Sequence, residues 1–160
     1  MPRGPDRSGA PVVSAAALIR WGWGWIMAWQ ETKSGAFVLL VEDDLYVREA
    51  MALLLECELG LPIVQVADGV QALAVLEAQP ASVVLTDLQM PAMDGMQLVR
   101  RLRRQPQTRG TPIMVMSGSS QRRQEALRAG ADMFVEKPFD YDDLVGKVRC
   151  LLRSPRVAAA

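Results

Sequence analysis

A small set of polar side chains stands directly after apolar segments of this 160-residue chain. These residues are Glu42, Asp43, Asp44, Asp87, Ser117 and Lys137. Carboxylates held within a few ångströms of one another repel, which raises a pKa or costs stability unless a cation lies among them. Their oxygens suit Mg²⁺, which keeps part of its water shell and recruits phosphate oxygens. A carboxylate nucleophile beside Mg²⁺ and a lysine is suited to forming an aspartyl phosphate.

The segments around these residues alternate between two patterns, which predict the elements that position them. Continuous apolar runs predict strands at 36–41, 62–67, 82–87, 111–118 and 132–139. Apolar residues at helical spacing predict helices at 45–59, 69–79, 95–105, 120–131 and 140–153. Strands that are apolar on both faces are typical of a parallel sheet covered by helices, so we predict an α/β fold.

A sheet of this kind would gather the polar residues at one edge, because ligands bind beyond the C-terminal ends of its strands. Taken alone, each residue has a simpler interpretation. Asp44 would cap the helix that follows it, whereas Asp87 and Ser117 would belong to turns. Glu42 and Asp43 would be solvated loop acids. Taken together with a lysine at the same edge, these residues favour a phosphoryl-binding site instead.

Four segments resemble the four motifs of the response-regulator receiver domain of two-component signalling. They read LLVEDD, VVLTDLQMPAMDG, MVMSG and FVEKPF, and their order and spacing fit the family over residues 36–153. The resemblance is to CheY-like receivers, which implies a flavodoxin-like (βα)5 fold. Its doubly wound, parallel, five-stranded sheet would have the strand order 2-1-3-4-5.

The resemblance implies a phosphoacceptor and a Mg²⁺ site. Asp87 would accept the phosphoryl group. The Mg²⁺ ion would bind Asp43, Asp87 and the backbone carbonyl of Gln89. Glu42 would act on the ion through a metal-bound water molecule.

The resemblance also implies which residues bind and sense the phosphoryl group. Ser117 and Lys137 would bind its oxygens, and the Lys137–Pro138 peptide bond would be cis. Ser117 and Phe134 would form a switch that remodels the face made by the fourth helix, fifth strand and fifth helix. Phe134 lacks the hydroxyl of the tyrosine found in some relatives, so packing alone would have to favour its inward position.

The predicted function is a phosphorylation-dependent signalling switch that is not an enzyme in the usual sense. It would be a phosphoacceptor that assists its own phosphorylation and dephosphorylation. The alternative is a degenerate receiver that acts as a phosphorylation-independent protein-interaction module. A Mg²⁺-dependent phosphatase of the haloacid-dehalogenase type needs a second Asp two residues after the nucleophile, where this chain has Gln89.

The amino-acid composition limits the kinds of catalysis and of binding partner that we expect. The chain has no histidine, which excludes Ser-His-Asp and Cys-His catalysis and makes a partner histidine kinase or phosphotransfer protein the expected donor. The formal net charge is zero, so we expect no nucleic acid or membrane partner. The two cysteines, without a CxxC spacing, favour a reducing cytoplasm, and the downstream protein target stays unidentified. The arginines of 100–104 are interpreted as a solvated helix face rather than a docking patch. Cys57 and Cys150 are interpreted as core thiols.

The two ends carry separate expectations. Residues 1–35 would be a flexible or loosely docked extension to a receiver domain at 36–153, and 154–160 a short tail. Alternatives for the extension are a natural start at Met27 or an anchor to a membrane or partner. Arg20, Gly22 and Gly24 interrupt its apolar run, which disfavours a membrane-spanning helix. We expect the receiver to stand alone, without an output domain.

Overall fold

The computed structural model describes residues 35–153, in which strands and helices alternate along the chain. The strands are β1 (Val38–Val41), β2 (Ile63–Val66), β3 (Val83–Asp87), β4 (Ile113–Ser117) and β5 (Met133–Glu136). The helices are α3 (Leu45–Leu59), α4 (Gly69–Ala78), α5 (Gly95–Arg104), the 3-10 turn η1 (Ser120–Arg122), α6 (Arg123–Ala129) and α7 (Tyr141–Arg153). None of these described helices is both long and apolar enough to cross a bilayer. The expectations for 1–34 and 154–160 lie outside the described residues, so the limits of the domain stay a prediction.

All neighbouring strands are parallel, and the sheet order is β2-β1-β3-β4-β5. The predicted flavodoxin-like fold is therefore confirmed. The register pairs Val41 with Thr86, Asp87 with Met116, and Ser117 with Glu136. The C-terminal ends of β1, β3, β4 and β5 consequently reach the same edge of the sheet, where sequence reasoning placed the polar residues.

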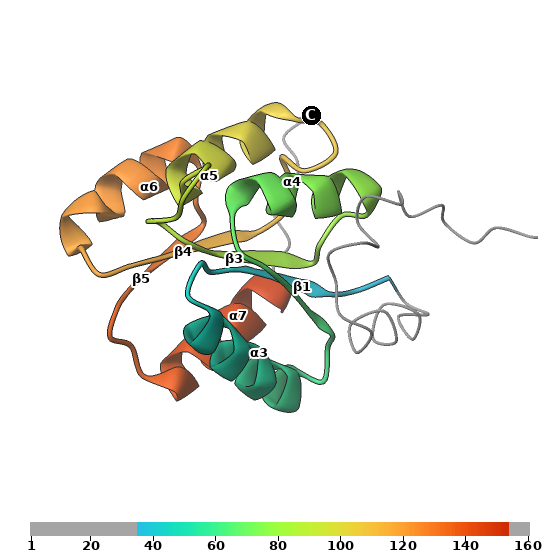
Figure 1. Ribbon diagram of the computed structural model, residues 1–160, viewed down its shortest axis with the longest axis vertical. Coiled ribbons are helices and arrows are strands. Elements are labelled where there is room, and N and C mark those ends of the chain that lie inside the picture. Colours follow the sequence, from blue (N-terminus) through green and yellow to red (C-terminus); the bar gives the residue numbers. More distant parts are fainter. Residues whose placement is uncertain (1–34, 154–160) are drawn as a thin grey trace, which may run out of the picture.

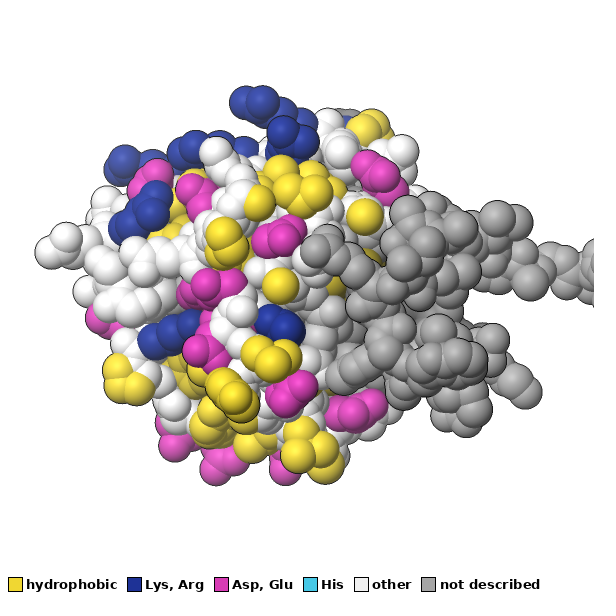
Figure 2. Space-filling model, viewed as in Figure 1, with side chains coloured by type: hydrophobic (Ala, Val, Ile, Leu, Met, Phe, Trp, Pro, Cys, Tyr) yellow, Lys and Arg dark blue, Asp and Glu magenta, His cyan; other side chains and the backbone are white. Residues whose placement is uncertain are grey.

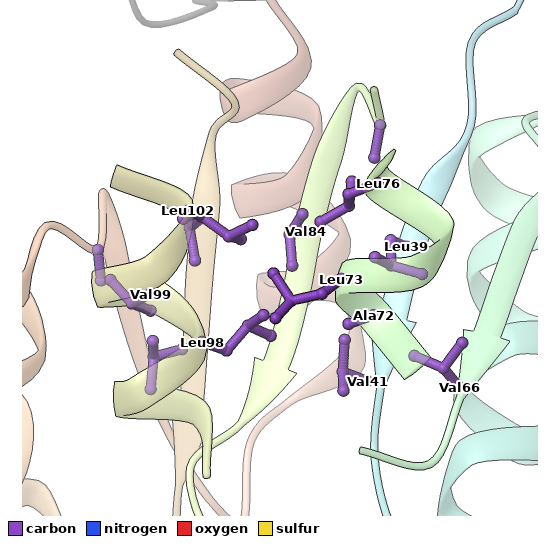
Figure 3. Packing of buried hydrophobic residues seen from close by; sticks show 14 of the residues in the cluster. Leu39, Val41, Val66, Ala72, Leu73, Leu76, Val84, Leu98, Val99 and Leu102 are labelled. Atoms are coloured by element: carbon purple, nitrogen blue, oxygen red, sulfur yellow. The ribbon is translucent and has the colours of Figure 1, made fainter. Parts of the chain in front are cut away.

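Helices cover both faces of the sheet, which explains why its strands are apolar throughout. Figure 1 shows α4, α5 and α6 on one face and α3 and α7 on the other. Leu39 and Val41 of β1 pack toward α4 and α5, whereas Val38 and Leu40 pack toward α3 and α7. Figure 3 shows Leu39 and Val41 of β1 close to Leu73 and Ala72 of α4. Because β3 is buried along its whole length, it forms a rigid support for Asp87 at its end.

Three aspartates near the C-terminal ends of the strands are N-caps of the helices that follow them. Asp44 accepts the Val47 N–H at 3.0 Å, which confirms the predicted cap of α3. Asp68 caps α4 in the same way. Asp94 caps α5 within a capping box whose other member is Gln97. An N-cap satisfies backbone donors that a helix cannot pair internally, so these three side chains have a structural role already.

The fourth predicted helix differs from expectation. It begins as the 3-10 turn η1, and the α-helical part starts only at Arg123. Ser119 precedes the turn but makes no side-chain capping bond, so a tighter turn forms where a capped α-helix would begin. The helix ends at Ala129 because Gly130 has φ 114°, a left-handed value that favours glycine.

Arg103 corrects the expectation that the arginines of α5 face solvent. Its guanidinium donates to the carbonyl oxygens of Gly130 (2.8 Å) and Thr111 (2.7 Å) and pairs with Asp132 at 2.7 Å. Arg103 thereby joins the end of α5 to the loops that precede β4 and β5. Arg100 and Arg101 are exposed as expected, and Figure 2 shows Lys and Arg side chains gathered over α5 and α6. Cys57 and Cys150 are also exposed, so the prediction that they are core residues is wrong.

We predict that Gly95→Ala lowers the free energy of unfolding by about 1–3 kcal/mol. The added methyl group would clash with backbone atoms, which cannot move aside without disturbing the strand. A Cβ at Gly95 would lie 2.2 Å from the carbonyl oxygen of Asp87. Gly146 of α7 is the control, since a Cβ there meets nothing within 4 Å. Gly146→Ala should raise stability by about 0.5–1 kcal/mol. Urea denaturation measures both variants, and equal effects would contradict the packing argument.

Candidate functional site

Asp87 occupies the last position of β3 and is 7% exposed. The Leu88 N–H donates to the Met116 carbonyl at 3.0 Å, so β3 stays tied to β4 one residue past the aspartate. The Gly95 N–H then donates to the Leu88 carbonyl, which brings the start of α5 back against the strand end. Backbone bonds on both sides thus fix the position from which the carboxylate projects.

The loop between Asp87 and α5 is held by a tight turn. Ala92 has φ 62°, and the Met93 N–H donates to the Pro91 carbonyl at 2.7 Å. This is a γ-turn with a central residue in a conformation that L-amino acids rarely adopt. Such backbone strain persists only where surrounding contacts impose it. One such contact is Met93, whose side chain packs against Gly69 at the start of α4.

Three acidic side chains meet at the edge of the sheet. One carboxylate oxygen each from Glu42, Asp43 and Asp87 lie within 4.8 Å of one another. Glu42 and Asp87 are buried, whereas Asp43 is exposed. The group has the geometry of a hard-cation site with one side open to solvent, which is the arrangement that suits Mg²⁺.

Lys137 reaches this group from the end of β5. Its Nζ lies 2.8 Å from Glu42 Oε2 and 3.2 Å from Asp87 Oδ1. The Lys137 backbone N–H donates to the Ser117 carbonyl at 2.8 Å, which extends the β4–β5 pairing to the lysine. The Lys137–Pro138 peptide bond has the cis geometry that the resemblance implies.

Burial and charge act in opposite directions on the two ends of this ion pair. Burial raises the pKa of Glu42, and Lys137 opposes that rise only in part. Burial alone would lower the pKa of Lys137, but the contacts with Glu42 and Asp87 outweigh it and raise the pKa. The Lys137 ammonium group contacts two of the three clustered carboxyl groups, so the site has more acidic groups than ammonium groups to pair with them.

Ser117 lies at the end of β4 and is buried. Its Oγ accepts the Ser119 N–H at 3.2 Å, so the turn role considered for it is present. A hydroxyl that accepts one bond still has its proton to donate, and the turn role leaves a phosphoryl-binding role open. Gln89 is exposed in the loop after Asp87, and the role of its carbonyl in metal binding stays a prediction.

Two residues that the sequence did not point to hold the backbone of the acidic residues in place. Arg48 of α3 donates to the carbonyl oxygens of Glu42 (2.6 Å) and Asp43 (3.3 Å). Thr86 is fully buried, and its Oγ1 donates to the Asp87 carbonyl at 2.9 Å. The only sequence feature that marks Thr86 is a polar residue inside an apolar strand. Nothing in the sequence marks Arg48, because an arginine in the first turns of a helix is usually solvated.

The family model of the response regulator receiver domain matches residues 38–149. The Synechocystis regulator RpaA, described as a DNA-binding dual master transcriptional regulator, is 34% identical over 120 residues. That match covers 72% of this chain and 48% of RpaA, so the chain spans about half the length of the curated relatives it matches.

Two solved structures extend the comparison. The chemotaxis response regulator CheY4 of Vibrio cholerae superposes with a TM-score of 0.67 at 30% identity, over 72% of this chain and 98% of CheY4. The receiver domain of the Pseudomonas aeruginosa sensor histidine kinase PA1611 gives a TM-score of 0.65 at 27% identity, over 74% of this chain and 99% of that one. In that structure a magnesium ion is coordinated in the active-site cleft.

We predict that Lys137→Met lowers the free energy of unfolding by about 1–3 kcal/mol at neutral pH in EDTA, because two buried carboxyl groups lose their cation. This cost exists only while the carboxyl groups are ionised. Burial already raises the pKa of Glu42, and removing the ammonium group raises it further, so the loss should shrink as the pH falls from about 8 toward 5.

Lys147→Met is the matched control for Lys137. Lys147 pairs with Asp143 one turn away on the exposed surface of α7, and such a pair contributes less than about 1 kcal/mol. Urea denaturation at several pH values measures both variants. A Lys137→Met effect as small as that of the control, at every pH, would show that the buried carboxyl groups do not depend on this lysine.

Proposed function

The chain belongs to the response regulator receiver domain family, and on that premise we propose that it is a phosphorylation-dependent signalling switch with Asp87 as phosphoacceptor. The observation that carries the proposal is the contact of Lys137 with both Asp87 and Glu42 beside exposed Asp43. Receiver domains of two-component systems are phosphoacceptor switches and not enzymes in the usual sense.

The chemistry assigned to Asp87 is nucleophilic attack. A carboxylate oxygen of Asp87 forms a bond to phosphorus, and the bond from phosphorus to the donor breaks with its electron pair leaving on the donor. The donor is a phosphohistidine of a sensor kinase or phosphotransfer protein, or a small acyl phosphate. The chain contains no histidine, so the phosphohistidine belongs to the partner.

Mg²⁺ fits the acidic group, and we assign its ligands to Asp43, Asp87 and the Gln89 carbonyl, with Glu42 acting through water. The fit rests on three clustered carboxyl groups that are matched by a single ammonium group. A bound Mg²⁺ would neutralise negative charge as the phosphoryl group is transferred.

Lys137 and Ser117 would then hold the phosphoryl oxygens. The Lys137 ammonium group already lies 3.2 Å from Asp87 Oδ1, and a phosphoryl group on that carboxylate would offer it new acceptors. The Ser117 hydroxyl would turn toward the phosphoryl group and give up its bond to the Ser119 N–H. That movement would favour the inward position of Phe134 and so act on the face formed by α6, β5 and α7.

The partners of the whole protein remain proposals. A sensor histidine kinase or phosphotransfer protein is the proposed donor, and a protein that reads the α6-β5-α7 face is the proposed target. Neutral net charge led us to expect no nucleic acid partner, but RpaA is described as DNA-binding, so that expectation has no support from the relatives. A phosphorylation-independent module is disfavoured, because the acidic group, Ser117 and Lys137 are all present together.

Asp87→Asn should abolish phosphorylation by acetyl phosphate in the presence of Mg²⁺, because the amide is no nucleophile toward phosphorus. Intact-mass spectrometry should find one added phosphoryl group on the unsubstituted chain and none on the variant. Asp68→Asn is the control: Asp68 also follows a strand at this edge, but it caps α4, and asparagine caps equally well. Uptake of phosphate by Asp87→Asn, or none by the folded unsubstituted chain, would refute the proposal.

Asp43→Asn should weaken Mg²⁺ binding by about tenfold or more, since even residues that only support metal ligands cost 10–100-fold in affinity. The neighbouring Asp44→Asn should leave affinity nearly unchanged, because Asp44 is exposed and caps α3. Isothermal titration with MgCl2 measures both variants. Equal affinities for the two would place the ion elsewhere.

A further inference from the structure

The ring of Phe134 lies inward, under α6. Phe134 is 5% exposed and packs in the core cluster between the sheet and α4, α5 and α6. The register pairs Phe134 with Val115, which belongs to the same cluster, and Ser117 lies two residues beyond Val115 on β4. Side chains two residues apart on a strand share a face, so Ser117 and Phe134 are diagonal neighbours on one side of the sheet.

The exposed residue Arg123 contacts this ring. Its Cζ lies 5.3 Å from the centroid of the Phe134 ring, a cation–π arrangement. Arg123 is the first residue of α6, directly after the 3-10 turn that follows Ser119. The contact therefore joins β5 to the start of α6.

Two neighbouring arginines on this surface share a carboxylate partner, whereas Arg123 has none among the described residues. Arg122 pairs with Glu125 at 3.0 Å, and Arg100 approaches the same carboxylate at 3.5 Å. Within residues 35–153, the Arg123 guanidinium makes no ion pair or hydrogen bond, and its charge lies over the Phe134 ring. Guanidinium groups are planar and weakly hydrated, which suits them to stacking on an aromatic face.

We propose that Arg123 is a positioning residue that holds Phe134 inward and thereby favours the phosphorylated arrangement of the switch. A tyrosine hydroxyl is absent here, and the guanidinium supplies a polar stabilisation of the inward ring that packing alone would not give. The role in switching rests on the proposed function, whereas the hold on the ring does not. By linkage, if the phosphoryl group favours the inward ring, Arg123 favours phosphoryl binding by the same factor.

The test uses the full chain labelled with 4-fluorophenylalanine, whose three phenylalanines give three fluorine signals. The Phe134 signal is assigned from its loss in Phe134→Leu. The variants are Arg123→Met, which keeps a long side chain without charge, and Arg123→Lys, which keeps the charge. Arg128→Met is the matched control, because Arg128 is an exposed arginine on the same helix. The change in fluorine shift between H2O and D2O reports how far the ring is exposed.

Each variant is then titrated with beryllium fluoride in MgCl2, a tetrahedral analogue of the phosphoryl group. Arg123→Met should increase ring exposure and weaken beryllium fluoride binding about two- to fivefold, the range expected for a cation–π contact near solvent. Arg123→Lys should restore part of both effects, and Arg128→Met should change neither.

Three results would overturn the proposal in whole or in part. If Arg123→Met leaves the Phe134 signal unchanged, or changes it no more than Arg128→Met does, Arg123 does not hold the ring. If the signal changes while beryllium fluoride affinity stays the same, Arg123 covers the ring but does not act on the switch. If the unsubstituted chain binds no beryllium fluoride, the proposed function and the switching role both fail, and the fluorine shifts alone decide whether Arg123 holds Phe134.

Discussion

The repulsion among three carboxyl groups at the end of a buried sheet is the constraint on which the rest of this structure depends. Parallel pairing forces the ends of β1 and β3 together, and Glu42, Asp43 and Asp87 come with them. Lys137 offsets part of the repulsion through its contacts with Glu42 and Asp87. A single ammonium group does not balance three acids, which leaves a site that gains from a further cation and from a ligand able to share its charge.

The acids of this edge fall into two groups that sequence alone separates only in part. Asp44, Asp68 and Asp94 follow strand ends or their loops and cap the helices that begin there. A capping side chain is turned toward backbone donors of its own helix, so it is not offered to a ligand. Spacing before an amphipathic segment identified Asp44 as a cap, because capping is local chemistry. That Glu42 and Asp43 meet Asp87 depends on strand register, which is a property of the whole sheet.

The same distinction decides what else could be predicted. The fold could be predicted from the five apolar runs and the turns between them, because a strand that is apolar on both faces must be buried on both faces. Arg103 was placed in solvent because its local pattern is a basic helix, yet its partners Gly130 and Asp132 are distant in sequence. The γ-turn at Ala92 carried no signal either, because the residue that adopts a left-handed conformation is not glycine. The contacts of Arg103 were missed because long-range packing imposes them, and a local sequence pattern does not show such packing.

Phe134 connects the charged edge to the outer surface of the molecule. Asp87 and Ser117 are buried at an edge where Asp43 stays exposed, so under the proposed function a downstream partner would sense phosphorylation through a movement that reaches α6, β5 and α7. Phe134 shares a sheet face with Ser117 and lies under Arg123, so one aromatic ring touches both the interior and an exposed cation. A cation at the surface and a phosphoryl group at the edge would then act on one two-state element from opposite sides. If Arg123 has the proposed role, a substitution there would shift the resting balance of this element without changing the residues that would bind the phosphoryl group.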